Sequence, residues 1–470
     1  MDRAATLPIP ADLREVLETA PELEQAFLAG GCVRDWFLGH TPKDFDIEVF
    51  GLTFDRLAKA LEPFGRVDLV GRSFGVVKLS RPSGAIYDFS VPRRDSKTAP
   101  GHKGFDIVVD ANLTPKEAAG RRDFTINSLL HNPRTGETLD FYGGLADLQA
   151  RVLRHTSAAF PEDPLRVLRG MQFAGRFQLK AAPETLALCQ AIAASHHELA
   201  VERIREEWCK WAAKAELPSA GLHFLRDSGW IEHYPEIREM IGTPQDPEWH
   251  PEGDVFTHTC HCCDAMARLP EWRNADESSR ITYMFAILTH DFAKPQTTHR
   301  ALKRGEWRIV SPGHEQAGGP LAEQFLNRIG VPLAIRERVT PLVMNHMAHF
   351  QNPTDHAVRK LSKRLEPENI QSLALVMRAD QMGRPPKPPI ISQTVQALLR
   401  KAEELRVLES APKPILQGRD LLKLGMPPGP AMGILLSKAY EAQLEGAFHD
   451  LSTALLWLEK KPSLDEGSAS

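Results

Sequence analysis

A pair of aspartates that follows a pair of glycines is the feature of this sequence with the clearest chemistry. Gly30 and Gly31 open a stretch typical of a helix, and Asp44 and Asp46 follow on a stretch typical of a strand. Residues i and i+2 of a strand point to the same face, so the two carboxylates would lie together and share a divalent cation. Hard oxygen ligands suit Mg²⁺, which takes substrate phosphates as further ligands. The pattern therefore predicts metal-assisted transfer of a phosphorylated group, with the glycine turn letting backbone N–H groups approach the phosphates.

Further charged residues in the first 150 positions fit the same chemistry. Asp88 falls on another strand pattern, where a third carboxylate would hold a second metal ion or help deprotonate an attacking hydroxyl. An ordinary strand-end aspartate is the alternative interpretation of Asp88. Arg121 and Arg122 could neutralise a triphosphate through bidentate contacts, and Asp123 could accept hydrogen bonds from ribose hydroxyls.

Asp163, Arg166 and Arg169 recur at positions i, i+3 and i+6 of a helical stretch. This spacing brings the three side chains near one face of the helix. A carboxylate accepts from an exocyclic amine and a guanidinium donates to ring nitrogens and carbonyls, so an Asp–Arg pair can imitate the edge of a base. The motif predicts that side chains choose the incoming nucleotide, and a capping carboxylate with a helix salt bridge is the plainer alternative.

Histidines and aspartates in the second half of the chain have the composition of a metal centre. An adjacent His-Asp pair would give one nitrogen and one oxygen ligand, and the remaining residues would complete the ligand set. Six such ligands could hold two metal ions that activate a water on a phosphoester, although the sequence leaves one metal ion or two open. The candidates are His258, His290, Asp291, His314, His346 and Asp380.

Three cysteines close to the first of these histidines invite a different interpretation. Cys260, Cys262 and Cys263 lie in the helix that should begin near His258. No second pair follows at zinc-finger spacing, so buried helix cysteines are favoured over a separate zinc site. The chain has only 6 cysteines in 470 residues, which makes no disulfide framework and favours a reducing cytoplasm.

Together these motifs resemble the class II nucleotidyltransferases of the polymerase-β superfamily, and within them the tRNA CCA-adding enzymes and bacterial poly(A) polymerases. The histidine and aspartate pattern resembles the HD phosphohydrolase domain that a subset of this family carries. The resemblance implies template-independent addition of C, C and A to the 3′ end of tRNA from CTP and ATP with Mg²⁺. It also implies hydrolysis of 2′,3′-cyclic phosphates or 2′-phosphates by the HD domain.

The resemblance also implies roles for individual residues. Asp44 and Asp46 would bind Mg²⁺, with Asp88 as the third catalytic carboxylate. The metal of the HD domain stays unidentified, as one or two divalent transition metals or Mg²⁺. The nucleotide-binding residues implied in this way are Gly30, Gly31, Arg34, Arg121, Arg122, Asp123, Asn127, Asp163, Arg166 and Arg169.

Two kinds of alternative remain open. Within the family, the chain could be an A-adding enzyme or a poly(A) polymerase. The stretch from Val70 to Gly75 departs from the form associated with the polymerases, and a long basic C-terminal extension is missing, so CCA addition is favoured. A hypothesis of a different kind is that HD phosphohydrolysis is the main activity and that the head only binds RNA. This hypothesis requires a broken head motif, and the sequence contains none.

The overall charge gives little guidance to the partner. A formal net charge of −4 does not by itself indicate nucleic acid, although clusters such as Arg93-Arg94 could contact phosphates locally. No run of 18 apolar residues and no signal-peptide core are present, so we expect no membrane partner and a cytoplasmic location. The sequence leaves the oligomeric state open between monomer and homodimer.

The elements that must position these residues predict an α+β chain of several domains. Strand patterns at Ile47–Phe50, Val76–Leu79 and Ile86–Phe89 predict a polymerase-β-like head with a mixed sheet, and Arg93–Phe105 is typical of a mobile loop. Beyond the head the patterns are helical. The predicted domains are a nucleotidyltransferase head (1–150), a helical neck (151–245), an all-α HD domain (250–385) and a helical tail that could contact tRNA (390–470).

Overall fold

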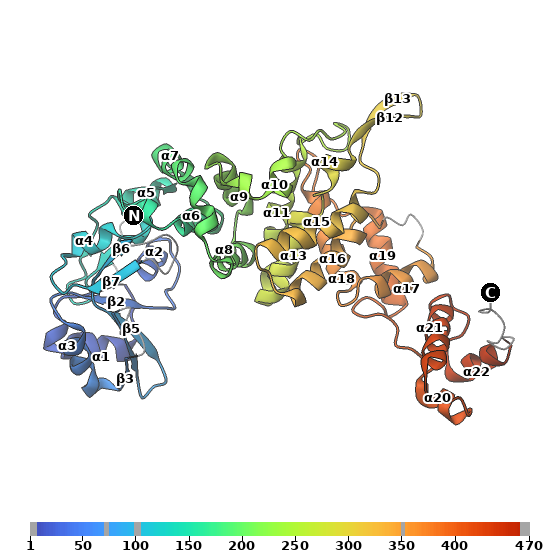
Figure 1. Cartoon of the computed structure of the whole chain (residues 1–470), viewed down its shortest axis with the longest axis horizontal. Helices are drawn as coiled ribbons and strands as arrows, with labels where there is room; N and C mark the ends of the chain where they lie inside the picture. Colours follow the sequence, from blue (N-terminus) through green and yellow to red (C-terminus); the bar gives the residue numbers. More distant parts are fainter. Residues whose placement is uncertain (1–6, 70–74, 98–104, 349–352, 461–470) are drawn as a thin grey trace. The chain divides into compact units, whose positions relative to one another are not determined.

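The computed structural model describes residues 7–69, 75–97, 105–348 and 353–460. The chain divides into two compact units, Met1–Pro235 and Glu236–Ser470, and Figure 1 follows it through both by colour. The first unit contains the predicted head together with most of the predicted neck, so the finer division into four domains stays a prediction. Two predicted features, the stretch 70–74 and the last ten residues of the tail, lie outside the described residues.

A seven-stranded mixed sheet with strand order β3-β4-β5-β2-β1-β8-β9 lies at the centre of the head. β2 and β5 run parallel, and the other neighbouring pairs run antiparallel. The predicted strand patterns and the predicted α+β class are confirmed. The strands are β1 (Ala26–Ala29), β2 (Asp46–Val49), β3 (Arg66–Asp68), β4 (Val76–Ser80), β5 (Ile86–Ser90), β8 (Leu130–His131) and β9 (Thr138–Leu139).

Alternating burial explains why these stretches form strands. β4 buries Val77 and Leu79, and its neighbour β5 buries Tyr87 and Phe89. Every second side chain of each strand therefore joins the core, while the residues between them face the other side of the sheet. The polar side chains at these intervening positions are the ones that can form a site.

Short helices connect the strands of the head. The second of them begins at Gly31, and Gly30 before it has a φ of 68°, which favours glycine. The glycine pair therefore makes the turn into a helix that the sequence predicts. The helices are α1 (Ala11–Thr19), α2 (Gly31–Phe37), α3 (Phe54–Leu61), α4 (Pro115–Gly120) and α5 (Gly144–Ala150), with 3₁₀ turns η1 (Pro21–Leu23), η2 (Glu62–Phe64) and η4 (Thr125–Asn127).

The start of the stretch from Arg93 to Phe105, predicted as a mobile loop, is a strand. β6 (Arg93–Lys97) pairs with β7 (Phe105–Val109), and residues 98–104 between them lie outside the described residues. The prediction of a loop was wrong for β6, because its polar composition hides the backbone hydrogen bonds that pair it with β7.

Helices of the neck approach one another closely because glycines line their contacts. They are α6 (Leu165–Phe177), α8 (Val201–Lys214) and α9 (Pro218–Asp227). A Cβ on Gly221 would lie 2.7 Å from the carbonyl oxygen of Met171 and 2.7 Å from Nε1 of the buried Trp211. The neck also contains β10 (Val152–Leu153), β11 (Lys180–Ala181), α7 (Pro183–Ala191), η5 (Phe160–Glu162), η6 (Ala193–Glu198) and η7 (Trp230–His233).

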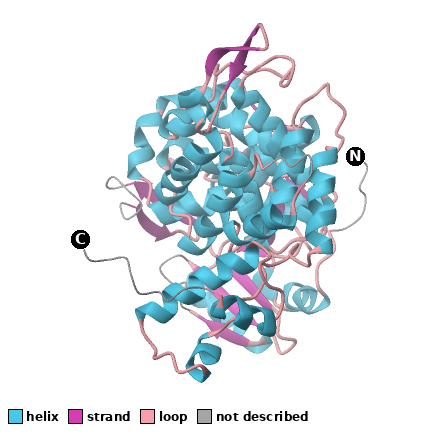
Figure 2. Ribbon diagram, turned by 90° about the vertical axis from the view of Figure 1, so that its right-hand side faces the viewer, coloured by secondary structure: helices cyan, strands magenta, loops and turns pink. Residues whose placement is uncertain are grey.

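The second unit is mainly helical, as Figure 2 shows. It also contains one two-stranded hairpin, β12 (His299–Lys303) with β13 (Glu306–Val310), so the predicted all-α block was wrong at this point. Half of the ten strand residues are polar and most are exposed or only partly buried, so no buried strand pattern revealed the hairpin. The helices between residues 235 and 382 are α10 (Pro235–Glu239), α11 (Val255–Arg268), α12 (Pro270–Asn274), α13 (Glu277–Thr289), α14 (Lys294–Thr297), α15 (His314–Arg328), α16 (Leu333–Asn345), α17 (Asp355–Arg364) and α18 (Ile370–Met382).

The tail has a small core of its own. α19 (Gln393–Glu404) still packs on α17 and α18, although the sequence predicts it as part of the tail. The separate core contains Leu416, Leu421, Met432 and Phe448. It is built by α20 (Gly418–Lys423), α21 (Pro430–Leu444) and α22 (Leu451–Glu459).

Within the described part of the chain, no helix combines the length and the apolar character needed to cross a bilayer.

Replacing Gly221 by alanine should destabilise the first unit by about 1–3 kcal/mol, because the new methyl group meets a backbone carbonyl that cannot turn aside. Urea unfolding of the whole chain measures the change. Gly433→Ala is the control, since nothing lies within 4 Å of a Cβ at this helical position. We expect this control to be neutral or stabilising by about 0.5–1 kcal/mol, and an equal loss in both variants would contradict the packing argument.

Candidate functional sites

A cavity of about 720 Å³ in the first unit gathers the predicted head and neck residues. Every one of them except Asp44 lines it, so residues that lie as much as 139 positions apart share one surface (Gly30 to Arg169). Their individual roles stay predictions. The predicted residues that line the cavity are Gly30, Gly31, Arg34, Asp46, Asp88, Arg121, Arg122, Asp123, Asn127, Asp163, Arg166 and Arg169.

Two carboxylates form the acidic edge of this cavity. Asp46 on β2 and Asp88 on β5 are direct partners in the parallel register, so their side chains lie on the same face of the sheet. Desolvation raises the pKa of Asp46 above its ordinary value; the charge of Arg122 opposes this shift, and those of Asp88 and Asp44 add to it. Crowded negative charge of this kind can be relieved by a bound cation, so the donor set fits Mg²⁺.

Asp44 occupies a different position from the one predicted. The strand begins at Asp46, so Asp44 precedes it, is exposed and does not line the cavity. The prediction that both carboxylates alternate on one strand was therefore wrong. The reason is that β2 pairs with its neighbours only from residue 46 onward. Asp44 still lies near enough to Asp46 to raise its pKa, so a share in binding a cation stays a prediction.

Arg122 is held in place by a carboxylate that the sequence analysis did not identify. Its Nη2 lies 3.0 Å from Oε2 of Glu48. Its guanidinium also lies over Gly30, where a Cβ would come within 2.6 Å of Nη1. Glu48 stands two positions after Asp46 on the same strand, so strand periodicity could have placed it in the site.

Asp123 connects the head to the neck. Its Oδ1 accepts a hydrogen bond from Nδ2 of Asn127 at 2.9 Å, and its Oδ2 accepts one from Nε of Arg169 at 2.7 Å. Burial opposes ionisation, but Arg169 and Asn127 hold the pKa of Asp123 below its ordinary value. Arg34 in turn donates to Oδ1 of Asn127 at 2.5 Å. The predicted contact of Asp123 with ribose hydroxyls stays a prediction beside this bracing role.

Asp163 and Arg166 face the same cavity but do not pair with each other. Asp163 precedes α6 and accepts from Nη2 of Arg203 at 2.9 Å. Arg166 donates to the carbonyl oxygens of Ala159 at 2.7 Å and Arg121 at 2.8 Å. The expected arrangement of three residues along one helix holds for two arginines only, because the helix begins at residue 165. Both side chains are nevertheless fixed in orientation.

One face of α8 adds basic residues to the cavity, and the sequence analysis missed two of them, Lys210 and Lys214. Arg203, Lys210 and Lys214 line the cavity together with Glu207. These four residues follow a helical spacing of four, three and four positions, so helical periodicity could have revealed them. Arg176 on α6 lines the cavity as well. The cavity therefore has an acidic edge at the sheet and a basic wall at the neck.

A second site lies in the second unit, where helices bring all six predicted metal ligands together. The ligands come from α11, from the C-terminal ends of α13 and α16, from the start of α15 and from α18, and all are buried. A cavity of about 590 Å³ reaches four of them. The six residues are His258, His290, Asp291, His314, His346 and Asp380.

Each of the four histidines uses Nδ1 for a fixed contact, which leaves Nε2 for the centre. Nδ1 of His290, His314 and His346 lies 2.7 Å from the backbone carbonyl oxygen three residues earlier. Nδ1 of His258 lies 2.7 Å from Oε1 of Glu252. Histidines that bind metals are oriented in this way by an acceptor on the other ring nitrogen. Glu252 is a residue that the sequence analysis missed.

The free nitrogens converge on the two carboxylates. Nε2 of His258 lies 3.0 Å from Oδ1 of Asp380, and Nε2 of His314 lies 3.4 Å from Oδ1 of Asp291. Nε2 of His290 is buried and lies 3.2 Å from Oδ2 of Asp291, although the two atoms are not aligned as a hydrogen bond. Histidine nitrogens that converge on carboxylates in this way form a donor set that fits a metal ion.

Two cations balance the carboxylates of the centre. Nζ of Lys294 lies 2.7 Å from Oδ2 of Asp291, and Nη2 of Arg384 lies 2.6 Å from Oδ1 of Asp380. Burial opposes ionisation, yet His290 and Lys294 hold the pKa of Asp291 well below its ordinary value, and Arg384 and His258 do the same for Asp380. Both carboxylates are therefore ionised, which is the form that binds metals.

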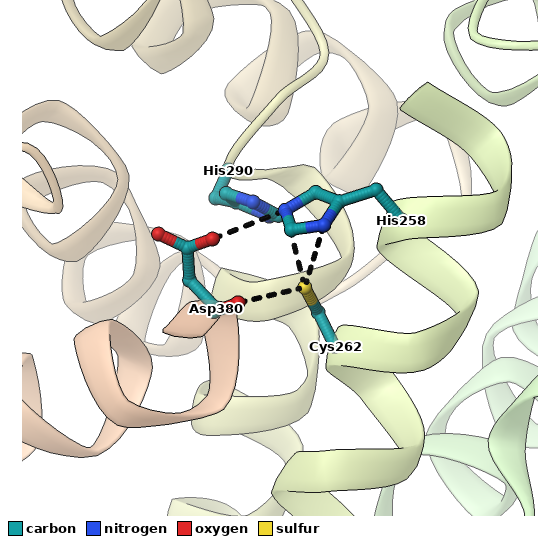
Figure 3. Close-up of side chains that lie close together, drawn as sticks. All are labelled: His258, Cys262, His290 and Asp380. Atoms are coloured by element: carbon teal, nitrogen blue, oxygen red, sulfur yellow. Dashed lines mark hydrogen bonds and ion pairs between the residues drawn. The ribbon is translucent and has the colours of Figure 1, made fainter. Parts of the chain in front are cut away.

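Sulfur lies beside this centre as well. Figure 3 shows Cys262 next to His258, His290 and Asp380. The sequence analysis interpreted the three cysteines as buried helix residues, and all three are indeed buried in α11. Their positions differ, however, because the described ligand cluster includes only Cys262 among them.

Comparison with known proteins places the chain in a family. Residues 26–154 match a family model described as the poly A polymerase head domain. A multifunctional CCA protein of Xanthomonas oryzae pv. oryzae is 35% identical over 434 residues, which is 90% of this chain and 98% of the relative. A multifunctional CCA protein of Cupriavidus metallidurans is 33% identical over 377 residues, or 77% and 85% of the two chains.

Solved structures share the fold at lower identity. The CCA-adding enzyme of Bacillus stearothermophilus in complex with CTP has a TM-score of 0.62 at 19% identity, and the match covers 96% of this chain and 98% of that one. The Thermotoga maritima CCA-adding enzyme complexed with tRNA has a TM-score of 0.55 at 16% identity, covering 96% of each chain. The sequence relatives decide the family, and the chain therefore belongs to the multifunctional CCA proteins.

Proposed function

We propose that this protein adds C, C and A to the 3′ end of tRNA, using CTP and ATP and no nucleic-acid template. The observation that carries the proposal is the pairing of Asp46 with Asp88 on one face of the sheet, opposite a wall of arginines. Nucleotidyl transfer needs this combination, because carboxylates hold the metal ion while guanidiniums hold the triphosphate. The relatives named as multifunctional CCA proteins support the substrate.

Each group of the cavity has a place in this reaction. Mg²⁺ held by Asp46 and Asp88, with Asp44 beside them, supplies charge neutralisation at the phosphates. Asp88 is also a candidate to help remove the proton from the attacking 3′-hydroxyl. Arg121 and Arg122 orient the triphosphate by charge and hydrogen bonds, and Glu48 keeps Arg122 directed into the cavity.

The neck residues supply the choice of base. Asp163 and Arg166 present an acceptor and a set of donors at the entrance of α6, both fixed by other groups. A site built from oriented hydrogen-bonding groups rejects a base that would leave them unpaired. CTP and ATP both carry an exocyclic amine that a carboxylate can accept from, whereas UTP offers a carbonyl at that position.

Purified protein given Mg²⁺ and tRNA transcripts that end before CCA, after C or after CC tests this proposal. We expect ordered addition of C, C and A that then stops, read at the 3′ end at nucleotide resolution. Asp46→Asn should lower the rate by about 100-fold or more, since it removes several kcal/mol of charge stabilisation. Asp68→Asn on the edge strand β3 is the control and should retain activity.

The alternatives give distinct results in the same assay. Addition of A alone, and only to the transcript that ends in CC, would indicate an A-adding enzyme. Long A tails on unrelated RNA would indicate a poly(A) polymerase. If no nucleotide is incorporated, the proposed transferase activity is wrong and phosphohydrolysis is the main activity.

Arg203→Met should reduce the selection of the base, because Asp163 then loses the guanidinium that orients it. We expect misincorporation of UTP or GTP relative to CTP to rise about tenfold, with a smaller change in the rate of correct addition. Arg205 lies on the same helix outside the cavity, so Arg205→Met is the control and should leave the ratio of incorrect to correct incorporation unchanged. Competition between nucleotides on the transcript that ends before CCA measures both, and unchanged selectivity in Arg203→Met would contradict the role of the pair.

We propose in addition that the second unit is an HD-type phosphohydrolase that acts on 2′,3′-cyclic phosphates or 2′-phosphates of RNA. The four histidines and two carboxylates that converge here would hold a metal ion, and such an ion would supply activation of a water for attack on the phosphoester. Lys294 and Arg384 line the same cavity and add positive charge to it. The site could hold one metal ion or two.

Glu252→Gln should weaken divalent metal binding by about 10-fold to 100-fold, because the carboxylate that orients His258 loses its charge. Glu248→Gln, four residues earlier and exposed, is the control. Metal content after dialysis and hydrolysis of 2′,3′-cyclic AMP are the two measurements. Chelation should abolish hydrolysis, and full activity after chelation would contradict a metal-dependent hydrolase.

The predicted partners follow from these activities: tRNA, CTP and ATP. The cytoplasmic location stays a prediction, and so does an oligomeric state of either monomer or homodimer.

A further inference from the structure

Cys262 has a position that the proposed phosphohydrolase does not use. It follows His258 by four residues on α11, so both side chains lie on the same face of that helix. Its Sγ lies 3.3 Å from Nε2 of His258, the nitrogen that faces the centre. One atom each from Cys262, His258, His290 and Asp380 lie within 4.8 Å of one another, as Figure 3 shows.

An independent observation is that one nitrogen of this cluster makes no hydrogen bond. Nε2 of His290 is buried and makes none to any described group, although it lies 3.2 Å from Oδ2 of Asp291 and its Nδ1 is satisfied by a backbone carbonyl. The nitrogen lies in the same cluster as the sulfur. A cation among these atoms would satisfy Nε2 of His290. The thiol of Cys262 does not donate to this nitrogen, because it donates to the backbone carbonyl of Asp380.

The thiol is held in this position by close packing. A Cβ on Gly383 would lie only 2.3 Å from Sγ of Cys262, so the glycine that ends α18 lets the backbone press against the sulfur. Cys262 is fully buried, and the neighbouring Cys263 is buried without joining the cluster. Helices α11 and α18 therefore both hold Sγ of Cys262 beside His258, whereas Cys263 is buried outside the cluster.

The distances suit a small four-coordinate ion. Typical metal–nitrogen and metal–sulfur bonds of about 2.0 and 2.3 Å place neighbouring ligand atoms roughly 3.3–3.8 Å apart in a tetrahedron. The separation of 3.3 Å between Sγ and Nε2 of His258 agrees with this range, and 3.0 Å between that nitrogen and Oδ1 of Asp380 is slightly shorter. The remaining ligand atoms lie within 4.8 Å of one another.

We propose that Cys262 is a metal ligand of this centre, together with His258, His290 and Asp380. This inference rests on the proposed metal-dependent phosphohydrolase and names the chemistry of its metal. A sulfur ligand selects a borderline or soft divalent ion such as Zn²⁺, Fe²⁺ or Co²⁺ over Mg²⁺. On binding, the metal–sulfur bond replaces the S–H bond and the proton passes to solvent.

The test uses Co²⁺ as a spectroscopic probe in the full-length protein freed of metal. Thiolate ligation gives Co²⁺ a charge-transfer band in the near ultraviolet, in addition to the weaker ligand-field bands in the visible that histidine and carboxylate ligands give. We expect both sets of bands in the wild-type protein. Cys262→Ser should lose the near-ultraviolet band and keep the visible bands, while Cys263→Ser, the matched control from the next position of α11, should keep both.

Each outcome decides the inference. A near-ultraviolet band that persists in Cys262→Ser, or that is missing from the wild type while visible bands are present, overturns the ligand role of Cys262 and leaves the metal centre intact. Absence of both sets of bands overturns the metal centre together with this inference. Cys262→Ala gives a second variant should serine disturb folding, which circular dichroism checks. Competition of Zn²⁺ against Mg²⁺ should favour Zn²⁺ less in these variants than in the wild type.

Discussion

The parallel pairing of β2 with β5 is the constraint on which the head depends. It sets Asp46 beside Asp88 with both side chains on one face, which a shift of one residue in register would destroy. Desolvation raises the pKa of Asp46, and the negative charge of Asp88 raises it further. Charge on Arg122 offsets part of the repulsion, and a bound cation would offset the remainder.

Positive charge in the cavity is oriented before any nucleotide arrives. Glu48 holds Arg122, Asp123 holds Arg169, and backbone carbonyls hold Arg166. Groups whose orientation is already fixed need little reorganisation when charge develops in the transition state. Two contacts join the head to the first neck helix, Asp123 with Arg169 and the Arg121 carbonyl with Arg166, so the packing of the neck helices sets the geometry of the cavity.

Much of the head could be predicted from the sequence, because residue type and spacing report strands and charged clusters directly. Register could not, since it depends on partners distant in the chain; this is why Asp44 was placed on the strand and β6 was taken for loop. Periodicity that was present went unused in two places: Glu48 follows Asp46 by two positions, and Cys262 follows His258 by four. Arg203 was visible only as part of an ordinary charged helix, since nothing local marks its pairing with Asp163.

The second site shows how a buried centre of high charge can exist before a metal ion enters. Lys294 and Arg384 each neutralise one carboxylate, so the ionised aspartates do not stand alone in a medium of low polarity. The Nε2 atoms of His290, His314 and His346 are oriented by the backbone contacts of the opposite ring nitrogen, Nδ1. A metal ion bound at the proposed centre would share Asp291 and Asp380 with these cations, which would weaken the binding of a hard ion that relies on carboxylates. An ion that gains from nitrogen and sulfur loses less by this sharing, so the arrangement of cations and the position of Cys262 favour the same class of metal.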